Sequence, residues 1–400
     1  MKILLLSVYY PPKPKSVATQ MHDLAQALVA QQHEVTVVTT TEDQKEKICI
    51  TKEKQVTVTR IRTKPFANIT KVNRLLRELQ LSSLIWKNSK NFFQNHHHDL
   101  IIFYSPPIFF SSLIKKLKKL WSAKVYLILR DLFPQWAVDI GLISQHGLPY
   151  KFLHYFEKKQ YKVADVIGVQ SEYNLHYFSE KKLKLSAKLE ILHNWKQTDD
   201  LQIQATNFRE KLELTNKVVF VYGGNIGVAQ DMPNIIRLAE KFSSYKNIHF
   251  LLFGDGDELN NIKQMIAQKQ LCNISIHPPL NSNEYLSTLS EFDIGIISLS
   301  KHLKTHNFPG KILDYMSVKK PILASINVSN DLQKCLENEN VGLVSINGND
   351  DLLFKNAQYL AANPGLRKIM GENGSKLLNS KFSAVQIAKQ ILNTTFFYGA

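Results

Sequence analysis

Apolar runs and helical patterns alternate from the first residues of the chain. Residues 2–10 (KILLLSVYY) form a continuous apolar run, as expected for a strand buried on both faces. Residues 17–32 then place apolar side chains at helical spacing, and residues 34–40 (EVTVVTT) are β-branched and strand-like. The chain therefore opens as strand, helix and strand, the start of a doubly wound α/β sheet.

The alternation continues and then begins again after a polar stretch at residues 196–206. In the first part, strands are expected at 56–61, 100–104, 124–130, 164–171 and 189–195, with helices at 70–93 and 108–121. In the second part, strands are expected at 217–225, 247–258, 274–280, 292–300, 320–325 and 341–346, with helices at 231–243, 310–318, 351–362 and 381–398. The pattern predicts two Rossmann-like α/β domains, 1–196 and 197–380, followed by a C-terminal helix within 381–400.

Length and composition agree with this division. A chain of 400 residues is too long for one ordinary core. The three cysteines form no C-x-x-C pair, which is typical of a reducing compartment. No signal peptide is expected, and the longest uncharged stretch, 100–114, is interrupted by two prolines. We therefore expect a cytoplasmic protein without a transmembrane helix.

The positive charge lies almost wholly in the first half of the chain. Residues 1–196 hold 30 Lys and Arg against 15 Asp and Glu, whereas residues 197–400 hold 20 against 19. This imbalance predicts an anionic partner for the first half. Phospholipid headgroups, a pyrophosphate-linked substrate and nucleic acid are the alternatives, but zinc-finger spacing, RNP-like aromatics and a basic tail are lacking, so nucleic acid is disfavoured.

Two helical segments interleave lysine or arginine with apolar residues, 71–93 and 108–121. Such a helix can lie in a membrane interface, or it can turn its apolar stripe to the core and its basic face to solvent. The charge of the whole half favours peripheral membrane binding.

The segment 306–317 carries the strongest chemical signal. Pro309 and Gly310 interrupt the chain just before a helix, and Lys311 adds a positive charge at the helix start, where an anion is favoured. Asp314, one turn later, can accept two hydrogen bonds from a vicinal diol such as ribose. The alternative is an ordinary loop and surface helix.

Two glycine-containing turns, 222–227 (YGGNIG) and 253–258 (FGDGDE), each follow a predicted strand. Glycine lets a phosphate or sugar approach the backbone closely, although tight βα turns also use glycine for steric reasons alone. Both turns and the segment 306–317 lie at predicted carboxyl ends of strands, where open α/β sheets bind ligands.

These segments together resemble the retaining glycosyltransferases of family 4. The resemblance rests on KILLLSVYYPP, ILRDLFPQWAVDIGLI (128–143), YGGNIGVAQDMPNII (222–236) and NFPGKILDYMSVKKPILAS (307–325), in this order. The stretch RDLFPQW is similar to the branch that builds O-antigen and capsule repeats, including N-acetylfucosaminyl-type transferases.

The resemblance implies the GT-B fold, in which the parallel sheets of two Rossmann-like domains face a central cleft. The C-terminal domain would hold the donor, a UDP-sugar with an N-acetylated sugar, and the final helix would cross back to the first domain. The first domain would meet a lipid-pyrophosphate-linked saccharide acceptor at the cytoplasmic face of the inner membrane. Transfer would retain the anomeric configuration and need neither a metal nor a cofactor.

The resemblance also assigns roles to single residues. Asp314 would hold the donor ribose, and His306 stands where the family has a Glu that grips the donor sugar. Lys311 would stabilise the departing diphosphate, while Arg130 and Asp131 would face the acceptor, with Asp131 orienting or deprotonating its hydroxyl. The donor-binding set would be Gly223, Gly224, Asn225, Gly227, Gly254, His306, Phe308, Pro309, Gly310, Lys311 and Asp314.

Weaker candidates have simpler explanations. Arg130 and Asp131 can also form a structural ion pair, residues 193–195 (HNW) read as hinge packing, and the histidines at 96–98 read as a solvated loop rather than a metal site. A nucleotide-sugar epimerase of GT-B fold remains an alternative function. A nicotinamide-dependent oxidoreductase is disfavoured, since no G-x-G-x-x-G follows the first strand.

Overall fold

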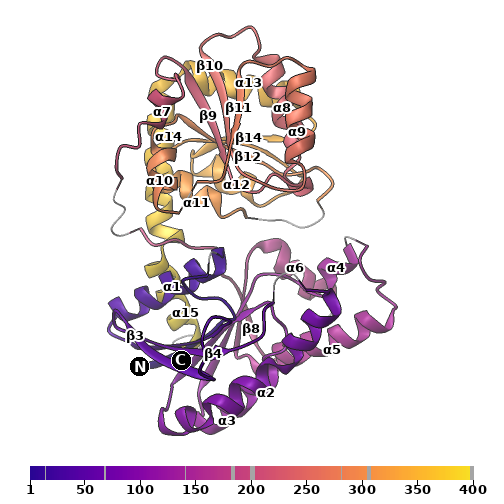
Figure 1. Ribbon diagram of the computed structural model, residues 1–400, viewed down its shortest axis with the longest axis vertical. Helices are drawn as coiled ribbons and strands as arrows, with labels where there is room; N and C mark the ends of the chain where they lie inside the picture. The colour runs from indigo at the N-terminus through magenta and orange to yellow at the C-terminus, as the bar shows by residue number, and fades with distance from the viewer. Residues whose placement is uncertain are drawn as a thin grey trace. The chain divides into compact units, whose positions relative to one another are not determined.

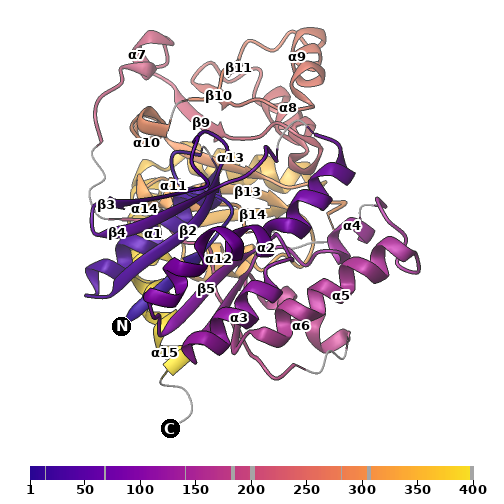
Figure 2. The same ribbon diagram turned by 60° about the horizontal axis from the view of Figure 1, so that its bottom comes forward.

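The computed structural model describes residues 1–13, 15–66, 69–139, 141–181, 185–198, 203–280, 282–303 and 308–396. The chain forms two compact units. Unit 1 comprises Met1–Gln197 together with Ala384–Ala400, and unit 2 comprises Thr198–Ser383. In each unit a sheet is covered by helices on both faces (Figures 1 and 2).

The described part of unit 1 is built around an eight-stranded sheet of order β3-β4-β2-β1-β5-β6-β7-β8. The strands are β1 (Lys2–Leu6), β2 (Glu34–Thr41), β3 (Ile48–Glu53), β4 (Val56–Arg62), β5 (Leu100–Ser105), β6 (Lys124–Leu129), β7 (Val166–Val169) and β8 (Lys188–Ile191). The helices are α1 (Ser16–Ala30), α2 (Lys71–Asn95), α3 (Ser111–Trp121), α4 (Gln135–Asp139), α5 (Leu148–Val163), α6 (Glu172–Glu180) and α15 (Ala384–Phe396).

Neighbouring strands of this sheet pair in parallel except β3, which runs antiparallel to β4. The sheet is thus parallel as predicted apart from this edge strand, which the sequence pattern did not predict. β3 is mostly exposed, so it lacks the continuous apolar run that marks the inner strands.

Each face of the sheet has its own core. Helices α2, α3 and α6 pack on one face through residues such as Ile85, Leu117 and Phe178. Helices α1 and α15 cover the other face, where Leu24 and Ile387 belong to the same buried cluster. Segments from both ends of the chain thus share one core.

Helix α15 is held on unit 1 by polar contacts as well. The Glu190 carboxylate accepts hydrogen bonds from the Tyr126 hydroxyl at 2.5 Å, Gln390 Nε2 at 3.0 Å and the Thr394 hydroxyl at 2.8 Å. Gln390 Nε2 also donates to the Ile191 carbonyl at 2.8 Å. These bonds join α15 to strands β6 and β8.

The described part of unit 2 has a six-stranded parallel sheet of order β11-β10-β9-β12-β13-β14. The strands are β9 (Val218–Gly223), β10 (Ile248–Phe253), β11 (Ile274–His277), β12 (Ile294–Ser298), β13 (Ile322–Ile326) and β14 (Gly342–Ile346). The helices are α7 (Phe208–Lys211), η1 (Val228–Gln230), α8 (Met232–Lys241), α9 (Leu259–Gln268), α10 (Ser282–Ser290), α11 (Lys311–Ser317), α12 (Leu332–Asn338), α13 (Asp350–Ala362), α14 (Pro364–Leu377) and η2 (Leu378–Phe382).

The strand order of unit 2 reverses between β9 and β12, because successive strands add outward on either side of this pair. Tyr315 of α11 contacts both β9 and β12 where these two strands lie side by side. Its hydroxyl lies 3.2 Å from the carbonyls of Val221 and Ile296 and accepts a hydrogen bond from the Gly223 amide at 3.4 Å. A Cβ at Gly295 would lie 2.4 Å from the Tyr315 ring, so glycine is required for this contact.

The histidine segment 96–98 is only partly the solvated loop that was expected. His98 is buried, and its ring centroid lies 4.7 Å from that of Trp121. Burial lowers the pKa of His98 to about 4, so the ring is neutral at pH 7. No metal-binding cluster of His, Cys, Asp or Glu occurs among the described residues.

Among the helices that the structure describes, none combines the length and the apolar character needed to span a bilayer.

The packing of α15 predicts a stability effect confined to unit 1. Replacing the fully buried Ile391 by Ala should lower the free energy of unfolding by about 2–4 kcal/mol, because a cavity opens against α1 and the sheet. All four tryptophans lie in unit 1, so their fluorescence during urea unfolding reports on this unit. The exposed Asn393 on the same helix provides the control, and equal stability of Asn393→Ala and Ile391→Ala would contradict the prediction.

Candidate functional site

The candidate site lies at the carboxyl edge of the sheet in unit 2, where β9 and β12 diverge. Gly223 ends β9, and the loop after β12 leads to Lys311 at the start of α11. Ligands of open α/β sheets bind at such a switch point because the loops on its two sides turn away from each other.

Lys311 projects onto the end of β9. Its Nζ atom lies 3.7 Å from the centroid of the Tyr222 ring. A Cβ at Gly224 would lie 3.2 Å from the same nitrogen, so the ammonium sits directly beside the glycine backbone. The negative face of the tyrosine ring compensates part of the charge.

The surroundings of Lys311 disfavour its positive charge. Desolvation lowers the pKa of Lys311 to about 7, although the carboxylate of Asp314 works in the opposite direction. A partly buried ammonium held by an aromatic ring and one carboxylate is poised to gain an anion. A diphosphate would raise the pKa and keep the lysine charged.

Glycines allow the turn after β9 to pack closely against the turn after β10. A Cβ at Gly254 would lie 2.1 Å from the Gly224 carbonyl oxygen, and Gly224 itself has a φ of +135°. Gly224 and Asn225 are exposed at the edge. Gly254 therefore supports the turn, while Gly224 presents its backbone beside Lys311.

Several amides of this turn already donate within the protein. Gly223 donates to Tyr315 at 3.4 Å, Gly224 to the Phe253 carbonyl at 2.9 Å and Ile226 to the Asp255 carbonyl at 2.8 Å. These three amides are therefore engaged within unit 2 itself.

The described residues just before α11 are partly buried in the core and partly exposed at the carboxyl edge of the sheet. Phe308 is buried, and its ring centroid lies 5.3 Å from that of Phe382. Among the residues that the structure describes, none has an atom within 4 Å of a Cβ placed at Gly310, and Gly310 is exposed. The Pro309 carbonyl accepts a hydrogen bond from Ile312 at 3.1 Å, and Asp314 is partly buried one turn into the helix. His306 lies outside the described residues.

Asn225 and Gln230 bind each other across the turn. The Asn225 side-chain amide donates to Gln230 Oε1 at 3.0 Å. Neither side chain carries a charge, so Lys311 is the cation that this turn and the start of α11 offer to a diphosphate.

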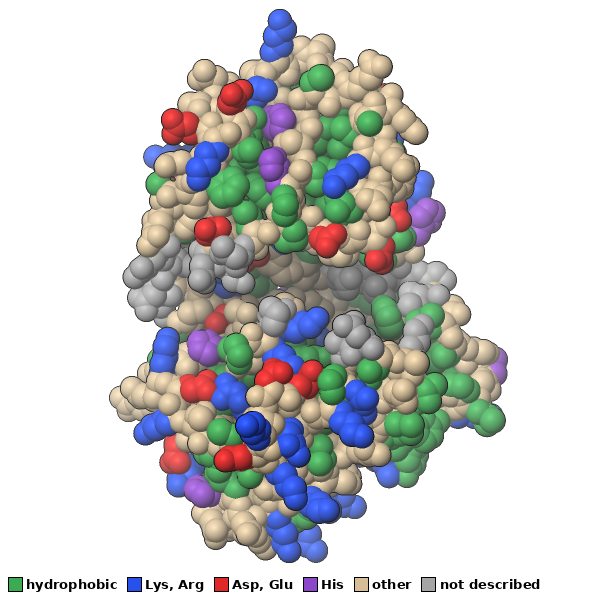
Figure 3. Space-filling view, viewed as in Figure 1, with side chains coloured by type: hydrophobic (Ala, Val, Ile, Leu, Met, Phe, Trp, Pro, Cys, Tyr) green, Lys and Arg blue, Asp and Glu red, His purple; other side chains and the backbone are tan. Residues whose placement is uncertain are grey.

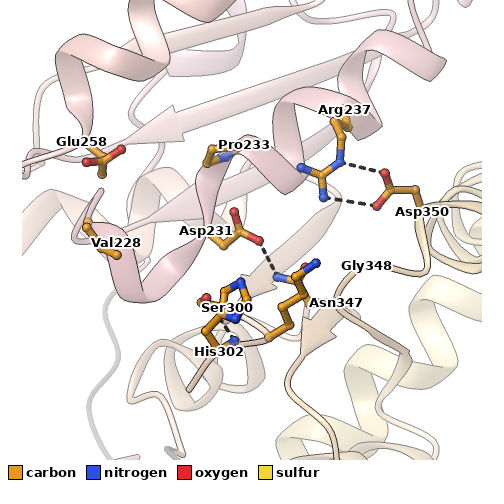
Figure 4. Close-up of a pocket in the computed structure, with 12 residues that line it drawn as sticks. Val228, Asp231, Pro233, Arg237, Glu258, Ser300, His302, Asn347, Gly348 and Asp350 are labelled. Carbon is orange, nitrogen blue, oxygen red and sulfur yellow. Dashed lines mark hydrogen bonds and ion pairs between the residues drawn. The ribbon is translucent and has the colours of Figure 1, made fainter. Parts of the chain in front are cut away.

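A polar cavity of about 560 Å³ opens at the same edge (Figure 4). It lies between the turn after β9, the loop after β12 and the loop after β14. Its lining residues are Gly227, Val228, Asp231, Pro233, Arg237, Glu258, Ser300, Lys301, His302, Asn347, Gly348 and Asp350. Hydroxyl, carboxylate, amide and imidazole groups together suit a polyhydroxylated ligand.

Asp231 is held in place within this cavity. It adopts the left-handed conformation with a φ of 44°, and its Oδ2 accepts a hydrogen bond from Asn347 Nδ2 at 2.9 Å. Asn347 also donates to the Leu299 carbonyl at 2.8 Å and joins the loops after β12 and β14. On the cavity wall, Arg237 forms an ion pair with Asp350 at 2.7 Å. Asp is one of the few non-glycine residues that tolerate this conformation.

Two family models match the chain in sequence. Residues 17–199 match the model described as Glycosyltransferase Family 4, and residues 204–377 match Glycosyl transferases group 1. Together the matches cover most of both units.

One similar sequence and two similar structures illustrate the likeness. The probable glycosyltransferase WbjE of Pseudomonas aeruginosa is 22% identical over 222 residues, and the match spans about half the length of each protein, 55% in both cases. Anabaena HepE in complex with UDP has a TM-score of 0.69, 14% identity and coverage of 98% of this chain and 99% of that one. WaaG, titled a glycosyltransferase involved in lipopolysaccharide biosynthesis, has a TM-score of 0.64, 13% identity and coverage of 99% and 100%.

The chain has the GT-B fold. The likeness to solved structures shows this fold, and each half of the chain matches a family model of glycosyltransferases.

The two candidates of unit 1, Arg130 and Asp131, differ in burial and in contacts. Arg130 is buried and donates to the carbonyls of Leu192 at 2.5 Å and His193 at 3.1 Å. Its guanidinium also lies 5.0 Å from the centroid of the Trp195 ring. Arg130 thus pairs with the main chain rather than with Asp131, and its catalytic role stays a prediction.

Asp131 itself is exposed at the carboxyl edge of β6 and stays a candidate. Residues 193–195 pack as expected for structural residues. Trp195 is buried, and its indole nitrogen donates to the Gln20 carbonyl at 2.8 Å.

Sequence reasoning missed Tyr222 as the platform for Lys311, and Asp231 with Asn347 as the frame of the cavity. In the sequence, Tyr222 is simply the last aromatic residue of an apolar strand, directly before the glycines. Asp231 and Asn347 are 116 residues apart, so no local pattern signals their pairing.

The position of Lys311 predicts a pH dependence for nucleotide binding. UDP should bind about 10-fold more weakly at pH 8.5 than at pH 7, because the free site loses its proton above a pKa of about 7. The terminal phosphate of UDP is already ionised in this range, so its own charge changes little. Isothermal titration calorimetry at both pH values tests this, and Lys311→Arg, which stays charged, should show a flat profile. A pH-independent affinity in the unsubstituted protein would refute the assignment.

Proposed function

We propose that this GT-B glycosyltransferase transfers a sugar from a UDP-sugar, with retention at the anomeric carbon, onto a lipid-linked saccharide. The sugar is N-acetylated, and the product is a repeat unit of O-antigen, capsule or exopolysaccharide. The acceptor is presented at the cytoplasmic face of the inner membrane, so the enzyme works there as a peripheral protein.

The placement of Lys311 carries this proposal. The leaving group of a sugar nucleotide is a nucleoside diphosphate that gains negative charge as the glycosidic bond breaks. A fixed cation in a partly desolvated site stabilises that charge without reorganising at the moment of reaction. Lys311, beside Tyr222 and the Gly224 backbone, fits this role.

The remaining donor contacts follow from the same edge. Asp314 is one turn from Lys311 and suits the two ribose hydroxyls. The adjoining cavity suits the transferred sugar, with Asp231, Ser300 and His302 as hydroxyl partners. Complexes titled with UDP and with UDP-glucose in HepE support a uridine donor.

The acceptor side rests on unit 1. Asp131 at the carboxyl edge of β6 is the proposed base or orienting group for the acceptor hydroxyl. The excess of lysine and arginine in residues 1–196 suits a pyrophosphate-linked acceptor and an anionic membrane. The description of WaaG supports a role in cell-surface polysaccharide synthesis.

Removing the cation tests the proposal directly. Lys311→Ala should lower kcat by about 10²–10³-fold, because the charge on the departing diphosphate loses its main partner. UDP release from a panel of UDP-sugars, with membrane extract as acceptor source, gives the rate. Lys263→Ala, an exposed lysine of α9, is the matched control. Near-normal turnover of a folded Lys311→Ala protein, or an epimerised donor without acceptor, would overturn the proposal.

The cavity yields a separate prediction. Asp231→Asn keeps a residue that tolerates the left-handed backbone but removes the carboxylate charge. The KM for the sugar donor should rise by about 10-fold, since a hydrogen bond to a charged acceptor is lost, while the Kd for UDP stays constant. Equal losses for UDP and UDP-sugar would show that Asp231 does not act on the sugar.

A further inference from the structure

The two helices expected to meet a membrane use their apolar faces inside the protein. In α3, Leu113, Leu117 and Trp121 are buried in the core of unit 1. In α2, Ile85 and Phe93 are buried in the same core. Of the large apolar side chains that the structure describes on these two helices, Val72 and Leu76 of α2 and Leu120 of α3 are exposed.

Helix α5 presents a stripe of three large apolar side chains to the outside. Leu148 is 81% exposed, Phe152 44% and Tyr155 54%. Their spacing of four and three residues places them on one face of the helix. The opposite face is buried through residues such as Leu153 and Tyr161, so the exposed stripe is not part of the core.

The preceding segment extends this apolar surface. Trp136 of α4 is 45% exposed, and Leu142 is 50% exposed. Phe133 and Ile143, on either side of them in sequence, pack with Leu153 of α5 in a small buried cluster. Figure 3 shows apolar side chains gathered over α4 and α5, beside lysine and arginine side chains of unit 1.

A hollow of about 720 Å³ lies next to this surface, between α3 and α5. Six lysines line it, three from each helix: Lys115, Lys118, Lys119, Lys158, Lys159 and Lys162. The apolar stripe and the lysines meet within α5, where Lys159 Nζ lies 4.2 Å from the centroid of the Tyr155 ring.

The charge of the hollow is largely uncompensated. Within the ranges that the structure describes, Lys118 alone of the six forms an ion pair, with Asp165 at 2.7 Å. Asp165 is itself shared, since it also accepts a hydrogen bond from the Val125 amide at 2.8 Å. Like charges gathered around one hollow repel each other, so an anion that enters it is favoured.

We propose that α5, Trp136, Leu142 and the lysine hollow form a docking surface for a bilayer that contains anionic phospholipids. The apolar side chains enter the interface, and the lysines bind the headgroup phosphates. The proposal rests on the membrane-bound acceptor proposed above and names the surface and the lipid class that it recognises. A lipid surface fits better than nucleic acid, because the lysines border large exposed apolar side chains.

Vesicle sedimentation tests the docking surface with the full chain. Vesicles of phosphatidylcholine with 30% phosphatidylglycerol should bind the protein, and pure phosphatidylcholine should bind it far more weakly. The double variant Lys158→Glu/Lys162→Glu should lose about 25-fold or more in vesicle affinity, about five-fold for each lysine. The matched control Lys87→Glu/Lys90→Glu changes the same charge on exposed positions of α2 and should bind like the unsubstituted protein.

The apolar contribution is tested in the same assay. Leu148→Ser/Phe152→Ser should lose about 10-fold in affinity for the anionic vesicles, whereas Val72→Ser/Leu76→Ser on α2 should not. Tryptophan fluorescence under urea verifies that each variant is folded. Equal losses in the α2 and α5 variants, binding that is insensitive to phosphatidylglycerol, or full competition by soluble inorganic pyrophosphate would overturn the proposal. So would self-association in gel filtration that disappears in Leu148→Ser/Phe152→Ser.

This experiment is independent of the transfer reaction. UDP binding, measured without vesicles, reports on unit 2, and vesicle binding, measured without nucleotide, reports on the α5 surface. Loss of one with retention of the other shows which of the two proposals fails.

Discussion

A positive charge that is only partly compensated organises the carboxyl edge of unit 2. Lys311 lies against an aromatic ring and a glycine backbone, and one carboxylate a turn away is its nearest opposite charge along the helix. Contacts of neighbouring residues shape the edge on which Lys311 lies. Tyr315 joins β9 to β12, Gly295 admits the Tyr315 ring, and Gly254 lets the neighbouring loop reach the turn.

The parts of the site that were predictable from sequence are those with a local requirement. A proline and glycine before Lys311, and glycines directly after an apolar strand, signal backbone geometry within a few residues. The partnership of Asp231 with Asn347 depends on loops from different strands, and only the folded sheet brings them together. The contacts of Arg130 could not be predicted from sequence. A charged residue at a strand end gives the same sequence pattern whether it points to a ligand or to main-chain carbonyls such as those of Leu192 and His193.

The fold follows the same rule. Buried parallel strands appear in the sequence as apolar runs, so their positions along the chain could be predicted closely. The exposed edge strand β3 lacks such a run. Helix α5 carries apolar residues on both a buried and an exposed face, so the helical period of its apolar residues is hard to recognise in the sequence.

The return of α15 to unit 1 has a consequence for the order of biosynthesis. The residues of α15 leave the ribosome only after all of unit 2 has been made, yet they fill one face of the core of unit 1. The nascent first sheet must therefore wait with α1 and its neighbouring strands half-covered until α15 emerges. During translation, the apolar surface reserved for α15 is open to chaperones that bind unfinished chains.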